Sequence, residues 1–170
     1  HMSRTAVIAG VGPGLGESLA RKFAVEGCDV ALFARSGEYI ETLAEDLPGT
    51  GEAVAIETDL TAVDQIRAGF ETVRSTLGPV DILVNHASAA SWTGLMDTSV
   101  EEFEDSWAVN GRGAFVCSQE AVGDMLDGSG GTVLFTGATS AVRSLGGAIG
   151  FTSAKFAARG MAMDIAQEYG

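Results

Sequence analysis

Short apolar runs alternate with longer stretches of helical periodicity along the 170 residues of this chain. The apolar runs are rich in β-branched residues, as buried strands are, while the stretches between them repeat apolar residues every three or four positions. Strands are predicted at residues 5–10, 29–34, 52–58, 80–85 and 130–137. Helices are predicted at residues 16–27, 39–47, 62–77, 100–126 and 154–169. This alternation predicts a single α/β domain over residues 1–170, with a doubly wound parallel sheet in a three-layer α/β/α sandwich.

The composition is that of a globular chain and bears on its cellular location. Hydrophobic residues make up 46% of the chain, and 23 glycines indicate many tight turns. No apolar run approaches the length of about 18 residues that a membrane span needs, so no membrane partner is expected. The opening His1-Met2-Ser3 is typical of the remnant of an expression tag, and no secretory signal follows it. The two cysteines are far apart and lack metal-ligand spacing, so we expect reduced thiols, no metal site and a cytoplasmic location.

The charge of the chain excludes one class of partner. Its net charge is −13, from 23 acidic residues and 10 basic ones. Such a chain repels a polyphosphate backbone, so nucleic-acid binding is not expected. Only Lys22 and Lys155 are lysines. An acidic, lysine-poor surface suits high salt, where self-repulsion is screened, although an ordinary acidic protein explains the same composition.

The first predicted strand runs into a glycine-rich turn, "AGVGPGLGES" at residues 9–18. Its glycines Gly10, Gly14 and Gly16 follow G-x-x-x-G-x-G, which differs from the dinucleotide spacing G-x-G-x-x-G. Glu17 and Ser18 stand where a Walker A loop requires lysine and a hydroxyl residue. Glycines between a strand and a helix still permit a sharp turn and leave room for a pyrophosphate at the helix N-terminus. A tight strand-to-helix turn that binds nothing is the alternative.

Polar residues also follow the later strands, at the sheet edge where open α/β sheets bind ligands. Arg35 follows the second strand, where an acidic residue would bind a ribose 2′-hydroxyl. An arginine suits a 2′-phosphate, so NADP(H) is favoured over NAD(H), with a solvated surface arginine as the alternative. Asp59-Leu60 follow the third strand, residues 85–88 follow the fourth, and Lys155 opens the last helix. Together with the glycine turn, these residues predict a Rossmann-type dinucleotide site.

This ordered series resembles the short-chain dehydrogenase/reductase family over the whole chain. The matching elements are the glycine loop, Asp59-Leu60, Asn85-x-Ala87, the segment "VNGRGAF" around Asn110, and Lys155. The resemblance implies that Asp59 holds the adenine and that Lys155 binds the nicotinamide ribose. It also implies a small-molecule substrate and a homodimer or homotetramer. The predicted cofactor-binding residues are Gly10, Gly14, Leu15, Gly16, Arg35, Asp59, Leu60, Asn85, Ala87 and Lys155.

The catalytic residues depart from the family's pattern. That pattern combines asparagine, serine, tyrosine and lysine, of which Asn110 and Lys155 remain here. Phe151 stands at the tyrosine position and Ala138 at the serine position, so both hydroxyl groups are absent. His86 also replaces an asparagine. The combination resembles an atypical branch of the family with phenylalanine in place of the catalytic tyrosine.

Two replacements for the lost proton donor are open. His86 is able to titrate near neutrality and donate a proton, or it is only a hydrogen-bonded neighbour of the adenosine half. Thr139 and Ser140, beside Ala138, are candidate hydroxyls, although such residues at strand ends commonly satisfy only backbone groups. Whether the chain is an enzyme therefore stays open.

Two functions are weighed on this basis. The first is an NADP(H)-dependent oxidoreductase with a degenerate active site and an altered proton route, for example one that reduces a conjugated double bond. General acid catalysis contributes on the order of 10²–10⁴-fold, so carbonyl reduction is expected to be slow. The second is a catalytically inactive, NADP(H)-binding regulatory or scaffold subunit.

The family's fold normally continues beyond the last predicted helix with further strands. We therefore expect that the C-terminal part of the usual fold is absent from this chain. Either the natural protein is longer, which is favoured, or the chain lacks the loop that covers the substrate. The fifth strand is then expected to form an exposed sheet edge.

Overall fold

Five parallel strands form the centre of the structure, a computed structural model that describes residues 3–170. The predicted tag remnant at residues 1–2 lies outside the described residues. The strands are β1 (Thr5–Ala9), β2 (Asp29–Ala34), β3 (Ala53–Glu57), β4 (Ile82–Asn85) and β5 (Thr132–Phe135). The helices are α1 (Leu15–Val25), α2 (Gly37–Asp46), α3 (Val63–Thr76), α4 (Val100–Trp107), α5 (Ala114–Asp127) and α6 (Ile149–Tyr169).

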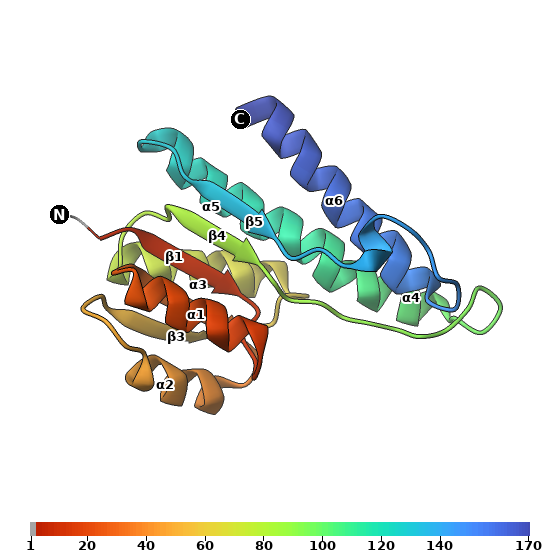
Figure 1. Ribbon diagram of the computed structural model, residues 1–170, viewed down its shortest axis with the longest axis horizontal. Coiled ribbons are helices and arrows are strands. Elements are labelled where there is room, and N and C mark those ends of the chain that lie inside the picture. Colours follow the sequence, from red (N-terminus) through yellow and green to blue (C-terminus); the bar gives the residue numbers. More distant parts are fainter. Residues whose placement is uncertain (1–2) are drawn as a thin grey trace.

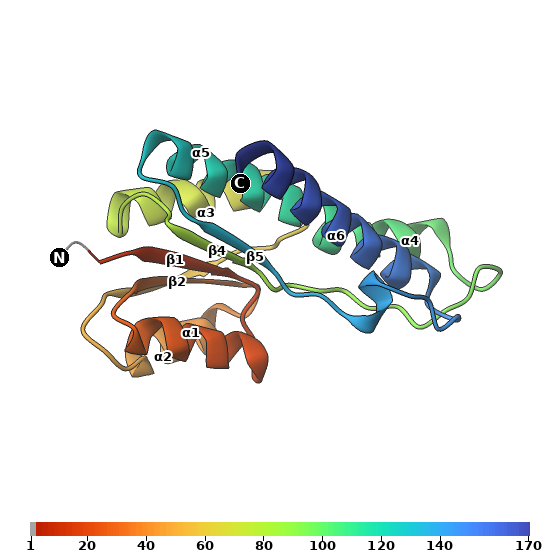
Figure 2. The same cartoon turned by 45° about the horizontal axis from the view of Figure 1, so that its top comes forward.

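The strands lie in the order β3-β2-β1-β4-β5, which is the order of a doubly wound Rossmann-type sheet. The chain returns to the centre of the sheet between β3 and β4, and this reversal creates a crevice beyond the carboxyl ends of β1 and β4. Helices α1 and α2 cover one face, while α3, α5 and α6 lie on the other (Figures 1 and 2). The predicted three-layer α/β/α architecture is confirmed.

The two sides of the sheet are apolar because successive side chains of a strand point to opposite faces. Along β1, Val7 packs with the α3 and α5 side, whereas Ala6 and Ile8 pack with the α1 and α2 side. Both faces of the central strands are covered by helices, which explains why their sequences are continuous apolar runs.

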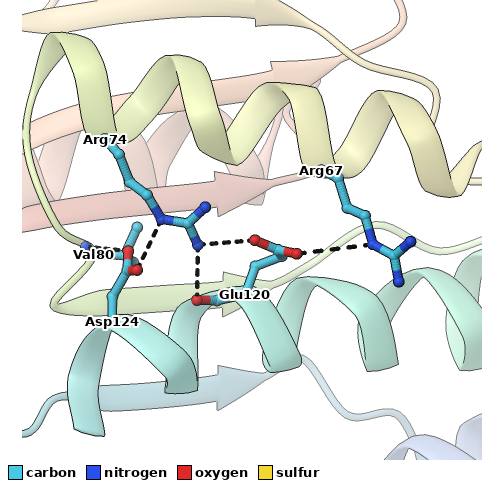
Figure 3. A network of polar contacts seen from close by, with 5 residues as sticks. All are labelled: Arg67, Arg74, Val80, Glu120 and Asp124. Atoms are coloured by element: carbon cyan, nitrogen blue, oxygen red, sulfur yellow. Dashed lines mark hydrogen bonds and ion pairs between the residues drawn. The ribbon is translucent and has the colours of Figure 1, made fainter. Parts of the chain in front are cut away.

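Figure 3 shows a polar network that joins α3 to α5 at the rim of one of these layers. The guanidinium of Arg74 donates from Nη2 to Glu120 Oε2 and from Nε to Asp124 Oδ1, each over 2.8 Å. Asp124 Oδ2 also accepts from the backbone N–H of Val80, at 2.9 Å. Arg67 is more loosely engaged, with 3.9 Å between its Nε and Glu120 Oε1. Arg74 thus connects two helices and, through Asp124, the segment that leads into β4.

Helix ends show where the sequence pattern was accurate and where it was not. Gly27 ends α1 as predicted: its φ of 83° permits bonds from Cys28 N to Phe23 O and from Gly27 N to Ala24 O, a Schellman motif. The single long helix predicted over residues 100–126 is interrupted by a π-helical turn at Ala108–Gly113. The last helix begins at Ile149, five residues before the predicted start at Ala154.

Strand β5 lies at one edge of the sheet and is bonded only to β4 among the described strands. Its Leu134 side chain is 43% exposed. The predicted exposed edge is therefore present in the structure. Within residues 3–170, no helix is both long enough and apolar enough to span a bilayer.

Candidate functional site

A cleft of about 950 Å³ opens at the carboxyl ends of the strands. All five strand ends contribute to it, through residues 10–12, 34–35, 58–61, 86–89 and 136–138. Phe151 and Lys155 of α6 close one side, and Asp105 of α4 and Val109 of the π-helical turn add to the wall. The cleft lies at the topological switch point, where the strand order predicts a ligand site.

The glycine turn is shaped by a close backbone approach between β1 and β4. A Cβ on Gly10 would lie 2.5 Å from Ala87 Cα, and the φ of Gly10 is +103°, so only glycine is free of strain there. By contrast, a Cβ on Gly12 would meet nothing within 4 Å, because Gly12 borders the open cleft. The turn therefore packs tightly against Ala87 at Gly10, while the backbone at Gly12 stays accessible from the cleft.

The predicted residues Gly14, Leu15 and Gly16 lie at the start of α1, beside the cleft rather than among the residues that line it. Gly14 is the N-cap and supplies no side-chain hydrogen bond. In the first turn of α1, Glu17 N–H already donates to Gly12 O at 3.2 Å, so an anion would be bound by the N–H groups of Leu15 and Gly16. Glu17 in that turn is an acidic neighbour, but its carboxylate accepts from Tyr39 Oη at 2.5 Å and from Arg21 Nε at 3.0 Å. These two bonds lower the pKa of Glu17, with the Tyr39 bond contributing most.

Arg35 and Asp59 both line the cleft at its β2 and β3 side. Arg35 is exposed, and its charge contributes to lowering the pKa of Asp59. The larger cause is Thr61, which donates its backbone N–H to Asp59 Oδ1 at 2.9 Å and its hydroxyl to the same atom at 2.7 Å. Leu60 is buried beside them and also borders the cleft.

Asn85 is the last residue of β4 and Ala87 follows it, but only Ala87 lines the cleft. The Asn85 side chain is buried below it, where Nδ2 donates to Ser118 Oγ over 3.1 Å. Its Oδ1 has no hydrogen-bond partner among residues 3–170. The structure thus places Asn85 as a support of the cleft floor.

Lys155 is the only lysine of the cleft and is 6% exposed. Its Nζ donates to the carbonyl of Thr136 over 3.1 Å and lies 5.8 Å from the centroid of the Phe151 ring. Within the described residues it forms no ion pair, and burial lowers the pKa of its ammonium group. A buried cation with spare N–H donors at a cleft wall is a site for ligand oxygens.

His86 reaches the same residue from another strand, with 2.9 Å between its Nδ1 and Thr136 Oγ1. Burial, and then the nearby charge of Lys155, lowers the pKa of the imidazole. The lowered pKa favours the neutral imidazole, which is a weaker proton donor than the imidazolium.

Asn110 occupies the π-helical turn, a distortion that is frequent at functional sites. Its Nδ2 donates to the carbonyls of Ala89 and Ser106, each at 2.9 Å, and so ties the segment after β4 to α4. Its Oδ1 has no hydrogen-bond partner in the described part of the chain. Asn110 does not line the cleft, so its side chain holds the wall in place.

Phe151 and Ala138, which stand at the tyrosine and serine positions, both line the cleft beside Lys155. The candidate hydroxyl of Ser140 is buried in the 3-10 turn Thr139–Ala141 and lies outside the residues that line the cleft. Thr136 was not singled out in the sequence, although it contacts both His86 and Lys155. Thr136 lies within the strand predicted at residues 130–137 but directly after the observed end of β5 at Phe135, so the sequence pattern gave no signal for it.

The sequence model for short chain dehydrogenase matches residues 4–170. The chain belongs to the short chain dehydrogenase family.

Relatives of this chain include the 3-oxoacyl-[acyl-carrier-protein] reductase FabG of Staphylococcus aureus, 32% identical over 135 residues. That match covers 78% of this chain and 55% of the reductase, so the chain spans about half of that relative's length. An alcohol dehydrogenase from Thermococcus sibiricus, complexed with 5-hydroxy-NADP, superposes with a TM-score of 0.93 at 28% identity, covering 98% of this chain and 71% of that one. A metagenomic short-chain oxidoreductase in complex with NADP gives a TM-score of 0.92 at 25% identity, with 98% and 77% covered.

Proposed function

We propose that this chain binds NADP(H) in the cleft and acts as an oxidoreductase whose usual proton-donating hydroxyls are missing. The observation that carries the proposal is Lys155, a buried ammonium group without a carboxylate partner among residues 3–170, at the wall of a cleft of about 950 Å³. Ribose hydroxyls would accept from its remaining N–H groups.

The other residues of the cleft fit a dinucleotide. Gly12 leaves its backbone open to a pyrophosphate, and the N-terminus of α1 favours negative charge there. Arg35 is exposed at the end of β2, where its guanidinium would pair with a 2′-phosphate, which supports NADP(H) over NAD(H). Two structural relatives hold NADP-type ligands, which supports the same class of cofactor. When bound, NADPH supplies a hydride.

The chain's own residues then limit the reaction. Lys155 orients the ligand by charged hydrogen bonds, whereas Phe151 and Ala138 offer no proton. The pKa of His86 is lowered by burial and by Lys155, which makes the imidazole a weaker replacement for the phenol. Losing a positioned general acid costs roughly 10²–10⁴-fold, so the site favours a substrate such as a conjugated double bond, whose reduction does not require a phenol.

A second candidate function is binding without turnover, as a regulatory or scaffold subunit. It is favoured by the joint absence of hydroxyls at positions 138 and 151 while the ribose-binding lysine is kept. Both functions share the same cofactor site and differ only in chemistry.

Nucleotide titration tests the shared part. NADPH and NADH are titrated by nucleotide fluorescence against the wild type, Lys155→Met and Arg35→Ala. We expect Lys155→Met to weaken both nucleotides by about 10- to 100-fold, as the loss of charged hydrogen bonds of roughly 1.5–3 kcal/mol implies. Arg35→Ala is expected to weaken NADPH alone. Failure of the wild type to bind either nucleotide would falsify the proposal.

Turnover separates the two candidates. Loss of NADPH absorbance is followed with enoyl thioesters, aldehydes and ketones. Wild-type turnover of an enoyl thioester supports the oxidoreductase, and its loss in His86→Ala would assign the proton route to that residue. Tight NADPH binding with no turnover of any of these compounds supports the non-catalytic candidate.

The proposal also includes a homodimer or homotetramer and a cytoplasmic location. Helices α5 and α6 border a groove of about 710 Å³ with exposed Phe115, Leu126 and Tyr169, which supports a second copy as the neighbour. Cys28 and Cys117 are free thiols, as expected in a reducing compartment. Sedimentation analysis over a range of protein concentrations tests the oligomer.

A further inference from the structure

An exposed tryptophan lies against the ring that replaces the catalytic phenol. Trp92, in the segment that joins β4 to α4, is 73% exposed. Its ring centroid is 5.3 Å from that of Phe151, and the two ring planes are inclined by 55°. Most of the Trp92 surface therefore remains open, although Phe151 itself is buried and lines the cleft.

The position of Trp92 is fixed by its sequence neighbours. The carboxylate of Glu102 on α4 accepts from the hydroxyl of Ser91 and from that of Thr93, the latter at 3.0 Å. The carbonyl of Thr93 accepts from Ile149 N at 3.1 Å, which joins the segment to the first turn of α6. Contacts on both sides of Trp92 thus hold it against the helix that carries Phe151 and Lys155.

Other exposed apolar side chains lie at this end of the molecule. Leu95 and Met96 follow Trp92 along the chain, and they are 74% and 90% exposed. Leu145, in the segment before α6, is 75% exposed. Both segments lie at the same end of the structure in Figures 1 and 2. None of these four side chains lines the cleft itself, but Trp92 contacts Phe151, which does, so this exposed apolar surface adjoins the cleft through that ring.

We propose that Trp92 is a specificity-determining residue that contacts the substrate, and that it selects a flat, apolar, aromatic or conjugated compound. The inference rests on the proposed function, because the substrate must approach Phe151 and Lys155 to meet the cofactor. A flat ligand would stack on the free surface of Trp92, where aromatic contacts add to the gain from burial. Ala138 and Phe151 carry no hydroxyl group, so they would offer no hydrogen bond to the carbonyl oxygen of a polar substrate.

Probe binding tests this assignment. Benzylideneacetone, a flat conjugated ketone, is compared with cyclohexylacetone, a saturated ketone, by calorimetry in the presence of saturating NADP⁺. We expect Trp92→Leu to weaken benzylideneacetone about three- to tenfold, Trp92→Phe to restore most of the affinity, and cyclohexylacetone to change little. Val25→Ala, which alters an exposed apolar residue at the C-terminal end of α1 and outside both the cleft and the α5–α6 groove, serves as the control.

Fluorescence supplies a second readout. In a Trp107→Phe background Trp92 is the only tryptophan, and we expect benzylideneacetone to quench its emission saturably. Prior titration with NADP⁺ separates the two proposals: no NADP⁺ binding means that the proposed function has failed. If NADP⁺ binds normally while benzylideneacetone binds neither protein, or binds wild type and Trp92→Leu equally, Trp92 has no such role. A Trp92→Leu protein that differs from wild type only in self-association would also overturn the assignment, since Trp92 would then lie at an interface between copies.

Discussion

Restoring the two missing hydroxyls tests whether their absence limits the chemistry. The double variant Phe151→Tyr with Ala138→Ser places a phenol and a hydroxyl at the two positions that line the cleft beside Lys155. Lys155 Nζ lies 5.8 Å from the centroid of the Phe151 ring, which sets the scale of its attraction for a phenolate. At that distance and an effective dielectric constant of about 20, Coulomb's law gives roughly 3 kcal/mol.

An attraction of this size lowers the pKa of the introduced phenol by about two units, from its ordinary value near 10 to roughly 8. Burial of the ring opposes the shift, because it disfavours the charged phenolate. A donor with a pKa this close to neutrality transfers protons efficiently, so we expect carbonyl reduction to rise by at least about 10²-fold over wild type. The rate should fall as the pH rises through the pKa of the phenol, because the deprotonated form donates no proton.

The assay follows loss of NADPH absorbance with a panel of aliphatic and aromatic aldehydes, for the double variant, each single variant and Phe151→Leu. Phe151→Leu controls for repacking of the ring site without supplying a proton. A double variant that binds NADPH like the wild type and still reduces none of these aldehydes faster would refute the reasoning, because the hydroxyls would then not be what limits the reaction.

Three further predictions concern the framework of the site. Arg74→Ala leaves Glu120 and Asp124 without their shared partner and should lower the free energy of unfolding by about 1–3 kcal/mol. Arg67→Ala should change it by less than about 0.5 kcal/mol, because the Arg67–Glu120 pair is 3.9 Å long and the Arg67 side chain is 60% exposed. Urea unfolding measures both effects, and equal effects would contradict the network of Figure 3. Gly10→Ala places a Cβ 2.5 Å from Ala87 Cα at a positive φ and should lower the melting temperature. Gly12→Ala should leave the melting temperature nearly unchanged and weaken NADPH binding. A Gly10→Ala protein as stable as wild type would show that glycine is not required at this close approach. The pKa of His86 is lowered in the folded chain, so below the ordinary value of 6.5 the unfolded chain binds a proton that the folded chain does not. The free energy of unfolding should therefore fall as the pH drops through that range. His86→Asn should flatten this slope in pH-dependent urea unfolding, and an unchanged slope would contradict the prediction.

The local pattern of the sequence was enough to predict all five strands and the alternation of helices. Buried parallel strands are continuous apolar runs, and the residue types at their ends are constrained by turn geometry, as Gly27 shows at the end of α1. Arg35 and Asp59, which follow strands, and Lys155, which lies in the last helix, were predicted from the sequence to share one site, and all three line the same cleft. The absence of hydroxyls at positions 138 and 151 is likewise a property of the sequence alone.

Other features depend on contacts between residues that are distant along the chain. The π-helical turn at Ala108–Gly113 left no mark on the helical periodicity, and its Asn110 reaches Ala89, 21 positions away. Thr136 is shared by His86 and Lys155 because β4 and β5 are neighbours in the sheet. The pairing of Trp92 with Phe151 needs a segment folded back onto α6 by Glu102 and Thr93. The sequence thus determined which chemical groups this protein has at its strand ends. Only the tertiary structure decided which of them are in contact and which are buried. The reason is that the pKa of His86 and the exposure of Trp92 are set by neighbours that no local pattern specifies.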